Sequence, residues 1–576
     1  MRLPPRLLKK RVTNVLACTT FATIAILTSC VTPMVVETDA KAPLLENFGT
    51  VAWPITTVKP EAQRLFDQGV LQAYAFNEYE AVRAFKAALA ADPGCAMCAF
   101  GVAWQLGPNI NAPERDSLTE IQRYALLARQ NAANLATPVT TRERALIEAM
   151  IARYGGVGVQ PKAVKVLPSD YCGTRSTRTA DPLDVVYAAH MRELVAAYPD
   201  DADIASMYAE AVMVATTDDW WNRKTGAAIG QIGVMASHLE RVLQKHPNHT
   251  GLNHYLIHAM DSSREPERAL AAADKLGALA PMSPHLRHMP AHIYVRTARF
   301  GDAVRVNQSA LASEITLKEQ LVNQNFKVVK NWDAHNTHFL WFAALMDGRA
   351  DTAFDSARRM AKRGAKGDHT WAEYQRSLPL LTLARLQRWE EVLAEPAPKP
   401  ESRYESAVHG YARAAALASA GKLAEARNAG APLEALVAEL KAKRRLSDDE
   451  KFGLPMMETL LAWQQAEIAM AAGDMNAAIA AATRGVEIED TFESREPPIL
   501  AAGSRTLLGQ IYLKAKRWSD AEKTFRDDLA DQPGSGWALR GLTIALTKQD
   551  KNTEATAVKA TWEKTWADAD LAMKRL

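Results

Sequence analysis

A short motif that recurs along the chain limits its fold more than any other feature. Each copy is a turn, often with Gly or Asn, then a polar step and an alanine. The alanines are Ala81, Ala269, Ala303, Ala353, Ala426, Ala478 and Ala521. A proline follows twelve residues later at Pro93, Pro281 and Pro533. Since proline ends helices and small residues let helices pack closely, the motif predicts repeated helical hairpins.

The length and the spacing of the motif predict an array rather than one core. The step from Ala269 to Ala303 is 34 residues, whereas Ala303 to Ala353 is 50, which indicates insertions. Because one hairpin cannot bury its apolar face alone, we expect an all-α superhelix, a solenoid of helical hairpins. We predict a leader at 30–58, N-terminal repeats with an insertion at 59–240, central histidine-lined repeats at 241–365, and C-terminal repeats with a cap at 366–576.

The first 29 residues have the pattern of a bacterial lipoprotein signal peptide. Basic residues from Arg2 to Arg11 precede a short apolar stretch, and Leu27-Thr28-Ser29-Cys30 closes it. We therefore expect Cys30 to be lipidated and to tether the chain to the bacterial envelope, facing the periplasm. Val31 favours the outer membrane. An uncleaved anchor and a plain secretory signal are the alternatives.

The charge of the chain gives no support to nucleic-acid binding. The net charge of +3 comes from five basic residues in the signal peptide, and without them 64 basic residues face 66 acidic ones. We therefore expect no nucleic-acid partner. Basic runs such as Arg358 to Arg363 are read as solvated helix faces.

Histidines concentrate in the centre of the chain. Of 13 histidines, ten lie between His238 and His338. Seven of them recur at fixed distances before the motif alanines of three successive hairpins: His254, His258, His285, His288, His292, His335 and His338. Residues three and four apart share a helix face, so the three hairpins are predicted to direct imidazoles to one surface.

This histidine pattern favours a transition-metal site. Neutral imidazole suits copper and zinc, and His254-x₃-His258 with Asp261 places two imidazoles and a carboxylate on one face. Seven histidines exceed the usual three or four ligands, so two metals, or one metal with supporting histidines, are both open. The expected compartment and nearby methionines place copper slightly ahead. The His-Glu-x-x-His motif of metalloproteases is absent, since Tyr255 replaces the glutamate.

Cys95-x-x-Cys98 is a second candidate site. In an oxidising compartment a disulfide is expected to compete with a soft-metal pair and with two small packed residues. Cys172 is a third partner or a free thiol. The tryptophan pair Trp220-Trp221 either forms the bottom of a ligand site or packs between repeats, and we favour packing. His190, His369 and His409 have no matching partners and are read as structural.

The 34-residue step, the small residues and the prolines resemble the tetratricopeptide repeat. Longer strings resemble a bacterial family of tetratricopeptide-repeat lipoproteins with histidine-rich central repeats, and distantly tetratricopeptide repeat protein 38. They are Cys95-Ala96-Met97-Cys98, Gly107 to Asn111, Asn253 to His258, His285 to Tyr294, His335 to Leu340 and Gly536 to Leu539. The resemblance runs from about residue 59 to the end. It implies the fold and no activity, and Asp261 departs from an expected glutamate.

In tetratricopeptide repeats the first helix of each hairpin lines the concave surface, so the resemblance places the histidines in a groove. We therefore expect an envelope-anchored protein that binds copper or zinc there. The main alternative is a scaffold that holds a peptide of an envelope protein, with protonated histidines and Arg296 on its carboxylates. Two further hypotheses stay open: histidines that only pack in the interior, and a metal-dependent enzyme of unknown reaction.

Overall fold

The computed structural model describes residues 39–112, 117–155, 181–216, 220–222, 224–492, 496–501 and 503–570. The predicted signal peptide, Cys30 and Cys172 lie outside them. Within them the chain is all α, and one isolated β-bridge joins Trp221 to Ala228. No described helix is long and apolar enough to cross a bilayer.

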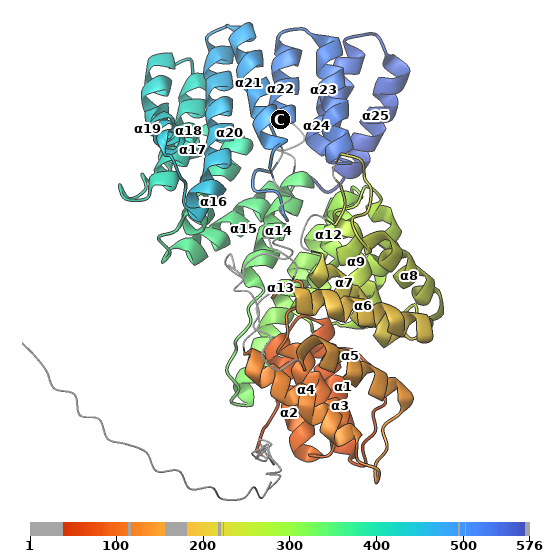
Figure 1. Ribbon diagram of the computed structural model, residues 1–576. Helices are drawn as coiled ribbons and strands as arrows, with labels where there is room; N and C mark the ends of the chain where they lie inside the picture. Colours follow the sequence, from red (N-terminus) through yellow and green to blue (C-terminus); the bar gives the residue numbers. More distant parts are fainter. Residues whose placement is uncertain are drawn as a thin grey trace, which may run out of the picture. The chain divides into compact units, whose positions relative to one another are not determined.

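Helices follow one another as antiparallel neighbours along the sequence (Figure 1). The N-terminal ones are α1 (Pro60–Tyr74), α2 (Glu78–Ala91), α3 (Ala96–Gln105), α4 (Leu118–Ala132), α5 (Thr141–Tyr154), α6 (Pro182–Ala197), α7 (Ala202–Ala215) and α8 (Ile232–Lys245). The central ones are α9 (Thr250–Asp261), η1 (Pro266–Ala269), α10 (Leu270–Leu279), α11 (Pro284–His288), α12 (Pro290–Arg296), α13 (Phe300–Asn323), α14 (Asp333–Met346) and α15 (Ala350–Gly364).

The C-terminal helices continue the pattern. They are α16 (Thr370–Arg385), α17 (Trp389–Ala394), α18 (Arg403–Ser419), α19 (Leu423–Ala442), α20 (Asp448–Ala471), α21 (Met475–Glu489), α22 (Ser504–Lys514), α23 (Trp518–Asp531), α24 (Gly536–Thr547) and α25 (Asn552–Thr565). The fold is a tetratricopeptide-like α-α solenoid, as predicted. The boundary predicted at 240/241 falls inside α8, while the division into three repeat regions stays a prediction.

The motif alanines explain why these helices pair. All seven are fully buried, six of them in the second helix of a pair and Ala269 in η1, just before α10. Pro93, Pro281 and Pro533 each follow the end of a second helix. The hairpins and their ends were therefore predicted correctly from the sequence, because small contact residues and helix stops recur with the hairpin itself.

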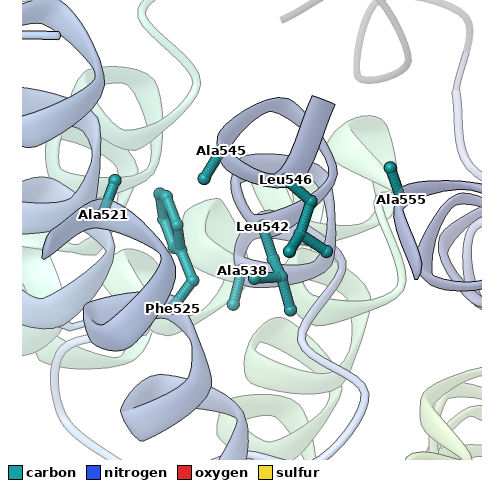
Figure 2. Packing of buried hydrophobic residues seen from close by; sticks show 7 residues of the cluster. All are labelled: Ala521, Phe525, Ala538, Leu542, Ala545, Leu546 and Ala555. Carbon is teal, nitrogen blue, oxygen red and sulfur yellow. The ribbon is translucent and has the colours of Figure 1, made fainter. Parts of the chain in front are cut away.

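A cluster in the last hairpins shows how such pairs are held (Figure 2). Phe525 of α23 packs against Ala538 and Leu542 of α24. A Cβ built at Gly541 would lie 2.2 Å from Cζ of Phe525, so only glycine leaves room for the ring there. Truncating such a buried ring costs about 3–5 kcal/mol.

The segment predicted as a leader packs on the repeats from residue 39 onward. Phe48 is buried against Leu317 and Leu321 of α13. The backbone carbonyl of Asn47 accepts a hydrogen bond from the N–H of Met282 at 3.1 Å. This part of the leader therefore belongs to the folded unit.

Candidate metal centre

The first helices of three successive hairpins bring the central histidines together. α9 carries His254 and His258, α11 and α12 carry the next three, and α14 carries the last two. Pro290 lacks an N–H and separates α11 from α12, yet the N–H of Met289 still bonds to the carbonyl of His285 at 2.9 Å, so the helical direction continues.

The predicted exposure of these histidines was wrong. All seven are buried, with exposed fractions from 0 to 7%. Phe76, at the turn after α1, lies 4.5 Å from His254 and 5.3 Å from His285 between ring centroids. Trp332 stacks on His285 at 4.2 Å, and Phe339 lies over the rings of the neighbouring hairpin. Aromatic side chains from other elements thus cover the face that was expected to line a groove.

Triad A is formed by His254, His258 and His285. The Nε2 atom of His254 lies 3.0 Å from Nε2 of His258 and 3.1 Å from Nε2 of His285. Nδ1 of His254 lies 2.7 Å from the carbonyl oxygen of Tyr74 and must donate its proton there. Nε2 of the neutral ring therefore offers one lone pair to two neighbours, which a single hydrogen bond cannot satisfy. A metal ion at this position would satisfy it, since tetrahedral ligand nitrogens lie about 3.3 Å apart.

Triad B is formed by His288, His292 and His335. Nε2 of His288 lies 3.0 Å from Nε2 of His292, and Nε2 of His335 is buried without a hydrogen-bond partner among the described residues. Nδ1 of His288 donates to Oδ1 of Asn307 at 2.7 Å, and the amide of Asn307 is held by donating to the carbonyl of Ala303. This bond leaves Nε2 of His288 without a proton when the ring is neutral.

Two carboxylates fix the remaining ring of triad B. Nδ1 of His292 lies 3.0 Å from Oδ2 of Asp261 and 3.1 Å from Oε2 of Glu496. Asp261 therefore lies on the edge of His292 opposite triad B, where it orients the ring. Asp261, His292 and Glu496 are also close enough to hold a cation themselves.

The carboxyl groups of Asp261 and Glu496, which both contact His292, differ in pKa. Burial, followed by the nearby charge of Asp261, raises the pKa of Glu496 to about 7. Burial acts to raise the pKa of Asp261 too, but the charge and hydrogen bond of His292 outweigh it and lower that pKa to about 2. An ionised Asp261 thus faces His292 across the neutral pH range.

The buried imidazoles are held in the form that binds metals. Burial lowers the pKa of His254 to about 3. Burial first, and then the neighbouring histidines, lower the pKa of His285, His288 and His335 well below its ordinary value. These rings are therefore neutral at pH 7, each with a lone pair for a metal.

The structure separates two predicted residues from the triads. His338 is buried but directs Nε2 to the hydroxyl of Tyr374 at 2.8 Å, and that hydroxyl donates to the carbonyl of Ile499. Its ring stacks on Trp341. Arg296 donates to the backbone carbonyls of Asp261 and Ser263, so its guanidinium ties the chain after α9.

The cysteine candidate has a definite state in the structure. Cys95 and Cys98 form a disulfide at the start of α3, so no thiolate pair is present there for a soft metal. Trp220 and Trp221 are buried, and Nε1 of Trp221 donates to the carbonyl of Ala259. Trp221 also borders an open cleft. His369 caps the N-terminus of α16.

Sequence reasoning missed the residues that orient and cover the histidines: Tyr74, Phe76, Asn307, Trp332, Phe339 and Glu496. For Asn307 the sequence holds one indication, because this polar residue lies within the buried stripe of α13 that includes Ala303 and Leu311. The sequence holds no such indication for Glu496, which lies next to Pro497 in a segment without hydrophobic periodicity.

Comparisons with known proteins find distant similarities. No family model matches the chain, and no curated protein does. Among solved structures, the human IFIT1 dimer is similar at 12% identity over 88% of this chain and 91% of the other, with a TM-score of 0.26. A Cut9–Hcn1 complex (12%, 89% and 95%, TM-score 0.20) and a Naa15/Naa10 complex bound to HypK (12%, 89% and 85%, TM-score 0.25) are similar too. Because these TM-scores are low, the site is described from the residues of this chain alone.

Proposed function

We propose that this protein binds two transition-metal ions, copper or zinc, one in each histidine triad. The observation that carries the proposal is the pair His288 and His292. In the neutral rings both Nδ1 atoms donate to an acceptor, so the two Nε2 atoms that face each other at 3.0 Å carry no proton. A proton between them, as when His292 is charged, would join only these two nitrogens, whereas a metal ion would also take the third ring of the triad.

The donor set supports copper or zinc over harder ions. Each triad offers three imidazole nitrogens and no carboxylate, and imidazole suits these two metals. A three-histidine site also leaves a further coordination position for water or another small ligand. Binding and handling of the metal is the role that we favour.

Metal content of triad variants tests the proposal. The untagged protein, loaded with zinc or Cu(II) and dialysed, is expected to hold two ions per chain by elemental analysis. His258→Gln and His335→Gln each remove one ligand from a different triad, and each is expected to lower the content to one ion. The double variant is expected to hold none.

His338→Gln is the matched control, because His338 is a buried histidine of α14 that lies outside both triads. Its variant is expected to keep two ions. Equal metal loss in all three single variants, or substoichiometric metal in the wild type after reloading, would contradict the proposal.

We also propose that the chain is tethered by lipid on Cys30 and faces the periplasm. The Cys95–Cys98 disulfide supports this location, since such bonds persist in oxidising compartments. Labelling with a radioactive fatty acid tests it, and label that survives Cys30→Ala would exclude the tether.

A second candidate function is binding of a basic segment of an envelope protein. It is favoured by an open cleft beside the carboxylate edge of triad B. Six acidic side chains line this cleft and outnumber its three arginines, Arg264, Arg296 and Arg505; the acidic ones are Asp261, Glu489, Asp490, Glu496, Asp528 and Asp531. A labelled Lys-rich peptide is expected to bind with an affinity that falls in high salt and ignores a chelator. Anisotropy unchanged by the protein would exclude this function.

A further inference from the structure

A hollow in the C-terminal repeats is lined by residues that the metal centre does not use. It is lined by residues of α14, α16, α18, α20 and the segment from Ile499. α16, α18 and α20 are neighbours in the fold (Figure 1). Two ionisable side chains and several aromatic ones meet there.

The ionisable side chains have unused hydrogen-bonding atoms. Nε and Nη2 of Arg385, the last residue of α16, are buried and have no partner among the described residues. Oε2 of Glu467 on α20 is in the same situation. Buried polar atoms are almost always bonded to protein, water or a ligand, so these atoms are available to a ligand that enters the hollow.

The unused atoms of Arg385 have a specific shape. Nε–H and Nη2–H form one edge of the guanidinium, and two parallel N–H groups bind both oxygens of a carboxylate. The acidic neighbours of Arg385 are engaged elsewhere. Glu489 accepts from the N–H of Ser504 at 2.6 Å, and Asp528 accepts from the hydroxyl of Thr506 at 2.8 Å.

The walls between these groups are flat and apolar. Nε1 of Trp341 donates to Thr382 and Nε1 of Trp463 donates to Ser504, both at 2.8 Å, so the two indoles have no unused donor. Tyr411 packs against Trp463 with ring centroids 6.3 Å apart. Tyr411 lies near both Arg385 and Glu467, since the charges of both act on its hydroxyl.

We propose that this hollow binds a small aromatic carboxylic acid that carries a hydroxyl group at the far end of its ring. The carboxylate lies on the Nε–Nη2 edge of Arg385, the ring lies between the aromatic walls, and the hydroxyl meets Oε2 of Glu467. Such a ligand supplies every partner that the unused atoms lack.

Calorimetric titration of the full-length protein with 4-hydroxybenzoate tests the proposal. We expect a Kd below about 1 mM. The uncharged 4-hydroxybenzamide is expected to bind at least about tenfold more weakly, because it cannot satisfy the guanidinium as an ion. Benzoate, which lacks the hydroxyl, is expected to fall between the two.

Variants locate the ligand. Arg385→Gln is expected to weaken 4-hydroxybenzoate at least about tenfold, and Glu467→Leu, which removes the hydrogen-bonding group, is expected to remove the advantage of 4-hydroxybenzoate over benzoate. Arg427→Gln on the exposed face of α19 is the matched control and is expected to change nothing. If Arg385→Gln does not fold, the comparison of acid and amide on the wild type decides alone.

Three results would overturn the proposal. The first is no binding of 4-hydroxybenzoate up to about 10 mM, well above the affinity expected for a site that fits it. The second is equal binding of the acid and the amide. The third is full binding by a folded Arg385→Gln variant.

Discussion

Replacing Asn307 with alanine should weaken triad B without touching any of its ligands. The amide oxygen of Asn307 accepts the Nδ1 proton of His288 at 2.7 Å, and its N–H group donates to Ala303 at 2.8 Å. Without the acceptor, the buried Nδ1–H is left unpaired, which costs about 1–3 kcal/mol in the metal-free protein. The proton can then move to Nε2, where it competes with the metal.

Loss of such an orienting partner lowers metal affinity about 10- to 100-fold, which corresponds to about 1.4–2.7 kcal/mol. Competition with a chromophoric chelator measures this, and only one of two zinc equivalents should weaken. Asn307→Asp keeps the acceptor and should retain the affinity. Asn253→Ala, which removes another buried asparagine of the central repeats, should lower stability alone. Wild-type affinity of both equivalents in Asn307→Ala would refute the reasoning.

Three further predictions concern the rest of the chain. Arg153→Leu leaves buried Asp184 without its 2.6 Å ion pair and should cost about 3–5 kcal/mol in urea unfolding, while pairing it with Asp184→Leu should restore most of this. Burial raises the pKa of Glu467 to about 8, so its stability contribution is full below pH 4.5 and is lost as pH rises through 8. Glu467→Gln should therefore gain a few kcal/mol over wild type at pH 9 and little at pH 5. Cys95→Ser with Cys98→Ser opens a four-residue loop and should cost about 2 kcal/mol or less in thermal unfolding, with metal content unchanged.

The solenoid was predictable because its period is local. Ala303 and Ala353 lie where two helices touch, and Pro281 lies where one helix ends. The residues that form each hairpin therefore recur with it along the sequence and can be recognised there. The same register predicted one common surface for the seven histidines, because first helices of successive hairpins lie side by side. It did not predict which of them meet, since His254 shares its register position with His288 but contacts His258 and His285.

The environment of the histidines could not be predicted in this way. Whether a first helix faces solvent depends on which residues pack against it. Here Phe76, 178 residues before His254, packs against its ring. Glu496, more than 200 residues after His292, contacts Nδ1 of that ring. Neither lies in a repeat register with the histidines. The groove was therefore expected to be open. Asp261, which was predicted to assist the histidines, contacts the outer edge of His292.

Anomalous diffraction from crystals of the metal-loaded protein, collected above and below the absorption edge of the bound metal, tests the central claim most directly. The account predicts two peaks. One lies among the Nε2 atoms of His254, His258 and His285, and the other lies among the rings of His288, His292 and His335. No peak at either triad, or a single peak at the carboxylates of Asp261 and Glu496, would contradict it.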